Sequence, residues 1–170
     1  ADELDACEST AVVFDFKNPR APKENIYSCA KRIVLENLNF ADIAMFKIDR
    51  PRSVAPVKFD TAGSIGVGDQ IAVIGHPWGT LQSIAIGNVT DRAESVMAVG
   101  KPQVPKDLAI LADAPSYTGN SGSCVFNTRT QELVGVLSTG APEVEYDSSA
   151  NCFRTIPASK MKSGDPYSVM

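Results

Sequence analysis

The sequence predicts an all-β protein, either a barrel or a sandwich, and three observations support this prediction. Short apolar segments recur along the chain, turn residues such as glycine and proline separate them, and helical periodicity is scarce. Short strands at this spacing are typical of β-barrels and β-sandwiches. The 170 residues, of which 44% are hydrophobic, suffice for one packed domain or two small ones.

The first group of predicted strands has three members, which cover residues 10–14, 26–35 and 43–48. Residues 17–22 contain two prolines and predict a hairpin loop between the first two strands. Three strands cannot close a barrel and would leave an unpaired edge, so we expect residues upstream of Ala1 to complete this part of the fold.

The second group of predicted strands has six members. They cover residues 70–74, 81–89, 108–111, 123–127, 133–138 and 152–156. A short C-terminal helix is expected only at residues 157–162, where proline suits the first turn. We find no internal repeat and no low-complexity segment in the chain.

The two groups of strands indicate two lobes. Residues 51–68 between them are rich in proline and glycine and poor in periodicity, as is typical of a linker. We therefore predict a first lobe at residues 1–55, a linker at 56–68 and a second lobe at 69–170.

The composition excludes several classes of partner. A formal charge of −4 without a lysine or arginine cluster argues against binding to nucleic acid. No apolar run is long enough to span a membrane, and the acidic residues at the start of the chain are unlike a signal peptide. One histidine and no C-x-x-C motif argue against a zinc site, so we expect neither a metal nor a cofactor.

The four cysteines predict disulfides. Cys7 and Cys29 flank the first predicted hairpin, whereas Cys124 and Cys152 lie on two later predicted strands. Of three possible pairings we expect the two local ones, Cys7–Cys29 and Cys124–Cys152, with four buried free thiols as the alternative. Disulfides form in oxidising compartments, so this pairing predicts a secreted or periplasmic protein.

The segment Gly119-Asn120-Ser121-Gly122-Ser123 is the strongest candidate for a functional site. A serine between glycines in a tight turn leaves its hydroxyl uncrowded, and the turn can direct the N–H groups of Gly119 and Ser121 to one point. The alternative is an ordinary β-turn, because the same residue types dominate turns.

Three catalytic arrangements compete for this serine, and each meets an objection. An α/β-hydrolase elbow requires G-x-S-x-G, but residue 123 is serine and no histidine follows Ser121. The order Asp42, His76, Ser121 matches that of subtilisin, but that fold is larger and α/β. A cysteine nucleophile at Cys124 would lie in an apolar strand, which is a poor place to lower the pKa of a thiol.

The remaining arrangement is the double-barrel serine peptidase, which this chain resembles in several segments. Residues 118–123, followed by an apolar strand, look like the nucleophile motif of trypsin-fold peptidases, and the G-N-S-G-S form is similar to the bacterial and glutamyl-endopeptidase-like branch. Residues 40–45 resemble the segment that carries the triad aspartate. Residues 73–79 and 133–140 resemble the start of the second barrel and the strand that pairs with the substrate backbone. The resemblance spans residues 10–160 and implies two antiparallel β-barrels, the first incomplete in this chain.

The resemblance also implies catalytic roles. Ser121 would attack the scissile peptide bond, and the N–H groups of Gly119 and Ser121 would form the oxyanion hole. Asp42 would orient a histidine that lies upstream of Ala1, because His76, between glycine and proline, is expected to be a structural turn residue. The implied function is a serine endopeptidase, inactive or very weak as an isolated chain. The alternative is an inactive protease-fold module that binds a peptide or protein partner.

The resemblance places the specificity pocket between two short segments. Its expected lining is Ser116, Tyr117, Thr118, Ser138, Thr139 and Gly140. Pro115 replaces the aspartate of trypsin-like pockets, which does not support a preference for arginine or lysine. Asn120 replaces the aspartate that pairs with a newly cut N-terminus, so local hydrogen bonds should hold the oxyanion turn. The expected partners are a peptide or protein substrate and a bound N-terminal fragment of the same precursor.

Overall fold

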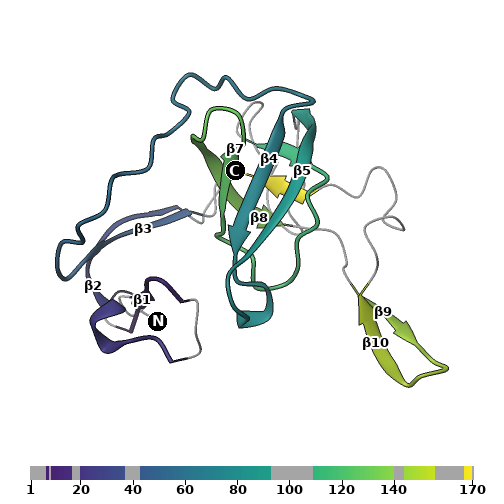
Figure 1. Cartoon of the computed structure of the whole chain (residues 1–170), viewed down its shortest axis with the longest axis horizontal. Helices are drawn as coiled ribbons and strands as arrows, with labels where there is room; N and C mark the ends of the chain where they lie inside the picture. The colour runs from purple at the N-terminus through teal and green to yellow at the C-terminus, as the bar shows by residue number, and fades with distance from the viewer. Residues whose placement is uncertain are drawn as a thin grey trace. The chain divides into compact units, whose positions relative to one another are not determined.

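The computed structural model describes residues 7, 9–16, 20–36, 43–92, 109–139, 144–155 and 167–169, and these residues are mostly strand (Figure 1). The strands are β1 (Ala11–Val13), β2 (Ile26–Glu36), β3 (Ile43–Ile48), β4 (Gln70–Gly75), β5 (Ser83–Arg92), β6 (Ile110–Ala112), β7 (Cys124–Asn127), β8 (Leu133–Thr139), β9 (Val144–Asp147), β10 (Cys152–Thr155) and β11 (Tyr167–Val169). Two single 3₁₀ turns, η1 (Lys23–Asn25) and η2 (Pro77–Gly79), complete the described elements. The predicted all-β class is confirmed.

The chain divides into two units, Ala1–Pro56 and Val57–Met170. The first unit contains the antiparallel sheet β1-β2-β3. The predicted disulfide between Cys7 and Cys29 is present in this unit. Cys29 lies on β2, so the disulfide attaches the segment before β1 to the central strand of the sheet.

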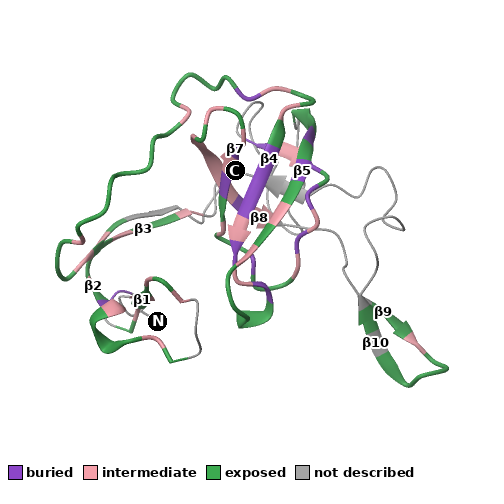
Figure 2. Ribbon diagram, in the orientation of Figure 1, coloured by how far each residue is buried: buried purple, intermediate pink, exposed green. Residues whose placement is uncertain are grey.

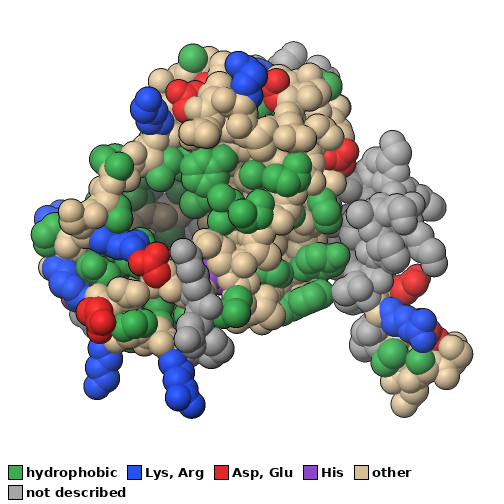
Figure 3. All heavy atoms as spheres, viewed as in Figure 1, with side chains coloured by type: hydrophobic (Ala, Val, Ile, Leu, Met, Phe, Trp, Pro, Cys, Tyr) green, Lys and Arg blue, Asp and Glu red, His purple; other side chains and the backbone are tan. Residues whose placement is uncertain are grey.

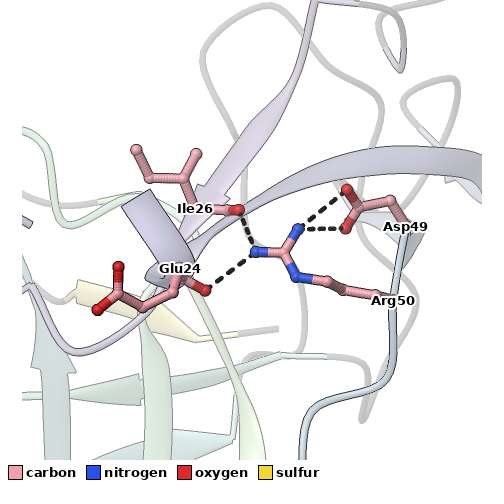
Figure 4. A network of polar contacts seen from close by, with 4 residues as sticks. All are labelled: Glu24, Ile26, Asp49 and Arg50. Atoms are coloured by element: carbon pink, nitrogen blue, oxygen red, sulfur yellow. Dashed lines mark hydrogen bonds and ion pairs between the residues drawn. The ribbon is translucent and has the colours of Figure 1, made fainter. Parts of the chain in front are cut away.

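Arg50, just after β3, connects segments of the first unit through its guanidinium group (Figure 4). One guanidinium nitrogen donates hydrogen bonds to the carbonyl oxygens of Glu24 at 2.9 Å and Ile26 at 2.7 Å. The other nitrogen lies 3.1 Å from the Asp49 carboxylate. The guanidinium also stacks 4.0 Å from the centre of the Tyr27 ring. A single planar group thus ties the end of β3 to the start of β2.

The second unit is a closed barrel with the strand order β11-β6-β5-β4-β7-β8. Its core consists of alternate residues of these strands, because successive side chains of a strand point to opposite faces. Ile71, Val73, Val89, Val125 and Leu137 are each at most 5% exposed. Figure 2 shows the buried residues concentrated on β4 and neighbouring strands.

The outer face of this barrel is also apolar in part. Ile84 and Ile86 on β5 are 64% and 48% exposed. They pair across the sheet with Ile74 and Ala72 of β4, so these four apolar residues are neighbours on one face. Figure 3 shows hydrophobic side chains gathered over β4 and β5.

The sixth strand of the barrel is not the predicted one. Residues 152–156 were expected to join the barrel, but β10 pairs with β9 in a separate two-stranded sheet. The barrel is closed instead by β11, which pairs with β6 and β8. Strands β9 and β11 had no counterpart in the sequence prediction. The predicted helix at 157–162 lies outside the described residues.

The predicted disulfide between Cys124 and Cys152 is wrong in this structure, where both cysteines are free and exposed. Cys124 begins β7 and pairs with Ile74 and Val136 inside the barrel. Cys152 pairs with Asp147 in the separate hairpin. The two thiols therefore belong to different sheets. The sequence prediction had placed both strands in one barrel, so it did not exclude this pairing.

The segment that follows Pro56 contacts the barrel. Phe59 forms a parallel bridge with Leu133, and the Asp60 carboxylate accepts hydrogen bonds from the N–H groups of Ser64 at 2.9 Å and Ile65 at 3.0 Å. These backbone hydrogen bonds lower the pKa of Asp60, and the bond from Ser64 has the largest effect.

Among the described residues, no helix has the length and apolar character needed to cross a membrane.

Titration of free thiols tests the cysteine assignment. The protein, denatured without reductant, should show two reactive thiols per chain, because Cys7 and Cys29 are paired while Cys124 and Cys152 are free. Ellman's reagent measures the number directly. Four thiols would contradict the Cys7–Cys29 disulfide, and none would restore the second disulfide.

The substitution Arg50→Lys tests the fastening of the first unit. An ammonium group cannot reproduce the planar set of contacts to two carbonyls, a carboxylate and a ring. We expect the free energy of unfolding to fall by about 1 kcal/mol, a modest value because the contacts are solvent-exposed. Urea denaturation followed by circular dichroism measures this change. Arg129→Lys, at an exposed position of the second unit, is the matched control, and an equal effect of both substitutions would contradict the role of Arg50.

Candidate active site

Ser121 lies in the turn that leads into β7, and the residue is exposed. The backbone of this turn bonds inward at three points. The N–H groups of Asn120 and Ser123 donate to the carbonyls of Tyr117 at 3.0 Å and Asn120 at 2.8 Å, and the N–H of Gly122 donates to the carbonyl of Leu137 on β8 at 2.7 Å. Gly122 has φ +81°, a conformation that favours glycine.

The N–H groups of Gly119 and Ser121 differ from these three. Within the described residues, no acceptor is found for either group. Gly119 has φ +93°, a backbone conformation that favours glycine over other residues. Among the described residues, the N–H groups of Asn120 and Ser123 thus bond within the segment 117–123, and the N–H of Gly122 bonds to β8, whereas those of Gly119 and Ser121 have no such acceptor.

The side chain of Asn120 is buried beneath the turn, with 3% of its surface exposed. Its amide nitrogen donates to the hydroxyl of Ser116 at 3.2 Å, and its amide oxygen lies 3.5 Å from the hydroxyl of Ser123. Ser116 is itself 2% exposed. Local hydrogen bonds between uncharged groups thus surround the residue that precedes Ser121.

Gly75, the last residue of β4, leaves space for the side chains of Ser123 and Asn120. A Cβ atom at residue 75 would overlap the hydroxyl of Ser123 and would lie 2.6 Å from the amide oxygen of Asn120. Only glycine allows such close approach of the strand to the turn. The end of β4 and the nucleophile turn are therefore packed in direct contact.

The turn after β4 forms the other side of this contact. His76 precedes η2, and its Nδ1 lies 3.0 Å from the carbonyl oxygen of Thr80. Because a carbonyl oxygen can only accept, the proton is on Nδ1. The Thr80 hydroxyl donates to the carbonyl of Pro77 at 2.7 Å, and the N–H of Gly79 donates to the carbonyl of His76 at 3.1 Å. His76 is thus part of a hydrogen-bonded turn.

Trp78 at the tip of this turn contacts the nucleophile segment. Its N–H donates to the carbonyl of Thr118 at 2.7 Å, and its ring stacks on Tyr117 with 5.0 Å between the ring centroids. A Cβ atom at Gly119 would lie 2.7 Å from the backbone nitrogen of Trp78. The sequence shows only a Pro-Trp-Gly turn signal at this position and does not predict the contact.

The structure places some of the predicted site residues and leaves others outside the described part of the chain. Ser116, Tyr117, Thr118, Gly119 and Ser121 form one continuous segment that contacts β8 through Gly122. Ser138 and Thr139 lie at the end of β8. Asp42 and Gly140 lie outside the described residues.

Two other chemistries find little support here. Desolvation raises the pKa of the Cys124 thiol, although the residue is partly exposed, and a raised pKa disfavours the nucleophilic thiolate. In the part of the chain that the structure describes, no group of three or more histidine, cysteine, aspartate or glutamate side chains could hold a metal ion.

The substitution Gly75→Ala tests the packing of β4 against the turn. The added methyl group would displace Ser123 and Asn120, so we expect a loss of about 2 kcal/mol in the free energy of unfolding, typical of overpacking. Chemical denaturation measures it. Gly66→Ala is the matched control, since its nearest atom, a carboxylate oxygen of Asp69, is 3.9 Å away. Unchanged stability of Gly75→Ala would show that the contact is loose.

Curated relatives of this chain are periplasmic proteases. A probable periplasmic serine protease (do/HhoA-like) of Haemophilus influenzae is 30% identical over 96 residues, which cover 56% of this chain and 20% of that protein. The periplasmic serine endoprotease DegP of Escherichia coli K12 is 29% identical over 96 residues, covering 56% of this chain and 19% of that protein. The chain therefore spans one fifth or less of the length of these relatives.

Solved structures support the fold. An HtrA-type protease, AlgW, crystallised with a decapeptide, superposes with a TM-score of 0.56 over 85% of this chain and 36% of that chain, at 18% identity. This likeness confirms the predicted trypsin-like β-barrel fold. Residues 6–136 match the profile described as the trypsin-like peptidase domain. Since this match covers most of the chain, the protein belongs to the family of trypsin-like peptidase domains.

Proposed function

We propose that the protein is a serine endopeptidase that cleaves peptide bonds through an acyl-enzyme on Ser121. One observation carries the proposal: the N–H groups of Gly119 and Ser121 have no acceptor among the described residues, while those of Asn120, Gly122 and Ser123 bond to Tyr117, Leu137 and Asn120. Preorganised donors of this kind stabilise the charge that develops on a carbonyl oxygen. The exposed position of Ser121 and the membership in the peptidase family support the same reaction.

The proposed reaction follows from these groups. The Ser121 hydroxyl oxygen attacks the scissile carbonyl carbon, and a histidine accepts the hydroxyl proton. The carbonyl oxygen becomes an oxyanion bound by the N–H groups of Gly119 and Ser121. The histidine then gives its proton to the leaving amine, and the acyl group stays on Ser121 as an ester. Water, deprotonated by the same histidine, hydrolyses the ester and releases the second product.

In this proposal the catalytic histidine is supplied by residues other than these 170, and His76 is a structural turn residue. The chain has one histidine, and His76 bonds through Nδ1 to the turn that supports Trp78. We propose that the base belongs to a segment upstream of Ala1, or to an N-terminal fragment of the same precursor that stays bound. Asp42 would accept a hydrogen bond from the second ring nitrogen of this histidine and hold its tautomer.

The substrate is proposed to be a peptide or a protein. Residues 116–118 and 138–140 would line the pocket for the side chain before the scissile bond, and their small polar character does not favour arginine or lysine. The decapeptide complex of AlgW and the endoprotease DegP support a peptide ligand. The periplasmic location of the relatives and the Cys7–Cys29 disulfide support export from the cytoplasm.

Labelling with a fluorophosphonate probe tests the nucleophile. In the natural protein with all its segments, we expect stoichiometric modification of Ser121, found by peptide mass spectrometry. Ser121→Ala should abolish the labelling, and Ser53→Ala, at an exposed loop serine, should not change it. The isolated 170-residue chain should react roughly a million-fold more slowly, since it lacks the base, and added imidazole should accelerate the reaction.

Two results would contradict the proposal. No labelling of the natural protein would favour an inactive module that binds a peptide without cutting it. Equal labelling of the isolated chain and the natural protein, unaffected by imidazole, would show that the base is not supplied from outside.

A further inference from the structure

The aromatic pair of Trp78 and Tyr117 lies beside the nucleophile turn and has no part in the reaction proposed above. The Trp78 side chain is 51% exposed, although tryptophan offers the largest apolar surface of any residue. Its ring stacks on Tyr117 at a tilt of 33°. About half of the surface of this residue therefore stays accessible.

The backbone holds this ring in a fixed position. Trp78 has φ +51°, which is a strained conformation for a bulky residue. Strained conformations persist only where surrounding contacts determine them, and the hydrogen bond to the Thr118 carbonyl and the packing against Gly119 are such contacts. The backbone of Trp78 is thus held by its contacts with Thr118 and Gly119.

The backbone of Trp78 lies close to the turn that carries Ser121, and its ring contacts Tyr117 in the same segment as Ser121. The backbone nitrogen of Trp78 is 2.7 Å from the position of a Cβ atom on Gly119, and Gly119 is two residues from Ser121. Two residues span at most about 7 Å of chain. An extended peptide advances about 3.3 Å per residue. Substrate residues within about three positions of the scissile bond can therefore contact the aromatic pair.

The surroundings favour an uncharged ligand group. Neither residues 76–81 nor residues 115–121 contain aspartate, glutamate, lysine or arginine. Leu81, which follows the turn, is 45% exposed and adds apolar surface to the same segment. A third aromatic ring can extend the existing stack and gain both area burial and ring geometry.

We infer that Trp78 and Tyr117 form a substrate-binding shelf that selects peptides with an aromatic side chain within about three residues of the scissile bond. The inference rests on the proposed function, because that function supplies the scissile bond at Ser121. Trp78 and Tyr117 act as specificity-determining residues and take no part in the chemistry.

Trp78 is the one tryptophan of the chain, so its fluorescence reports on the shelf without any catalysis. The probes are two octapeptide mixtures, one with phenylalanine fixed at the fourth position and one with alanine, and all other positions randomised among non-aromatic residues. The protein is the Ser121→Ala variant, which binds peptides but does not cleave them. The phenylalanine mixture should change the emission of Trp78 at roughly five-fold lower concentration than the alanine mixture.

Variants of the second ring complete the test. Tyr117→Ala should abolish this preference, and Tyr117→Phe, which keeps the ring, should retain it. Tyr146→Ala, which removes an exposed tyrosine ring on β9, is the control and should retain it as well. Circular dichroism confirms that each variant is folded.

An equal response to the two mixtures would overturn the shelf, and so would a preference that survives in Tyr117→Ala. Fluorophosphonate labelling separates this failure from a failure of the proposed function. Labelled Ser121 without a peptide preference would remove the shelf alone. A preference without labelling would leave the shelf as a peptide-binding site and remove the hydrolase.

Discussion

The buried amide of Asn120 is the constraint on which the described site depends. Its amide oxygen lies close to Gly75 at the end of β4, beside the hydroxyl of Ser123, and its amide nitrogen bonds to Ser116 beneath the turn that carries Ser121. An uncharged amide can be buried at lower cost than a carboxylate, because it needs no counter-charge. Among the described residues, the contacts that hold the turn at residues 119–123 are hydrogen bonds between uncharged groups. The turn after β4 also contacts residues 117–119, so the end of β4, the turn at Trp78 and the turn that carries Ser121 pack together.

Two strands were predicted well because apolar residues and turn residues mark their bounds. The strand at 70–74 agrees with β4 within one residue, and most of β4 is buried. The strand at 43–48 agrees with β3, an apolar segment of intermediate and exposed residues that the sequence ends with Asp49 and Pro51. Strands β9 and β11 were missed for different reasons. β9 forms an isolated hairpin with exposed residues, so no buried face marks its period. β11 has three residues, too few for any periodicity to be seen.

The candidate site shows a similar division. The glycines of the 119–122 turn were informative because positive φ angles at Gly119 and Gly122 demand glycine, so the local sequence encodes the geometry. The contacts of Trp78 with Thr118 and Tyr117 were not predictable, since they join residues about 40 positions apart in the sequence. The false pairing of Cys124 with Cys152 has the same origin: proximity across sheets depends on which strand closes the barrel.

The mixture of one disulfide and two free thiols governs how the protein can be handled. In air, Cys124 and Cys152 on separate molecules will cross-link through their exposed sulfurs, and covalent oligomers will accumulate on storage. Dithiothreitol prevents this but also attacks Cys7–Cys29, which ties down the start of the first sheet. Alkylation of the folded protein with iodoacetamide resolves the conflict, since it caps the two accessible sulfurs and leaves the existing cross-link intact. The cap on Cys124 would then lie three residues beyond Ser121, where a fluorescent or spin label could report on the entrance to the site.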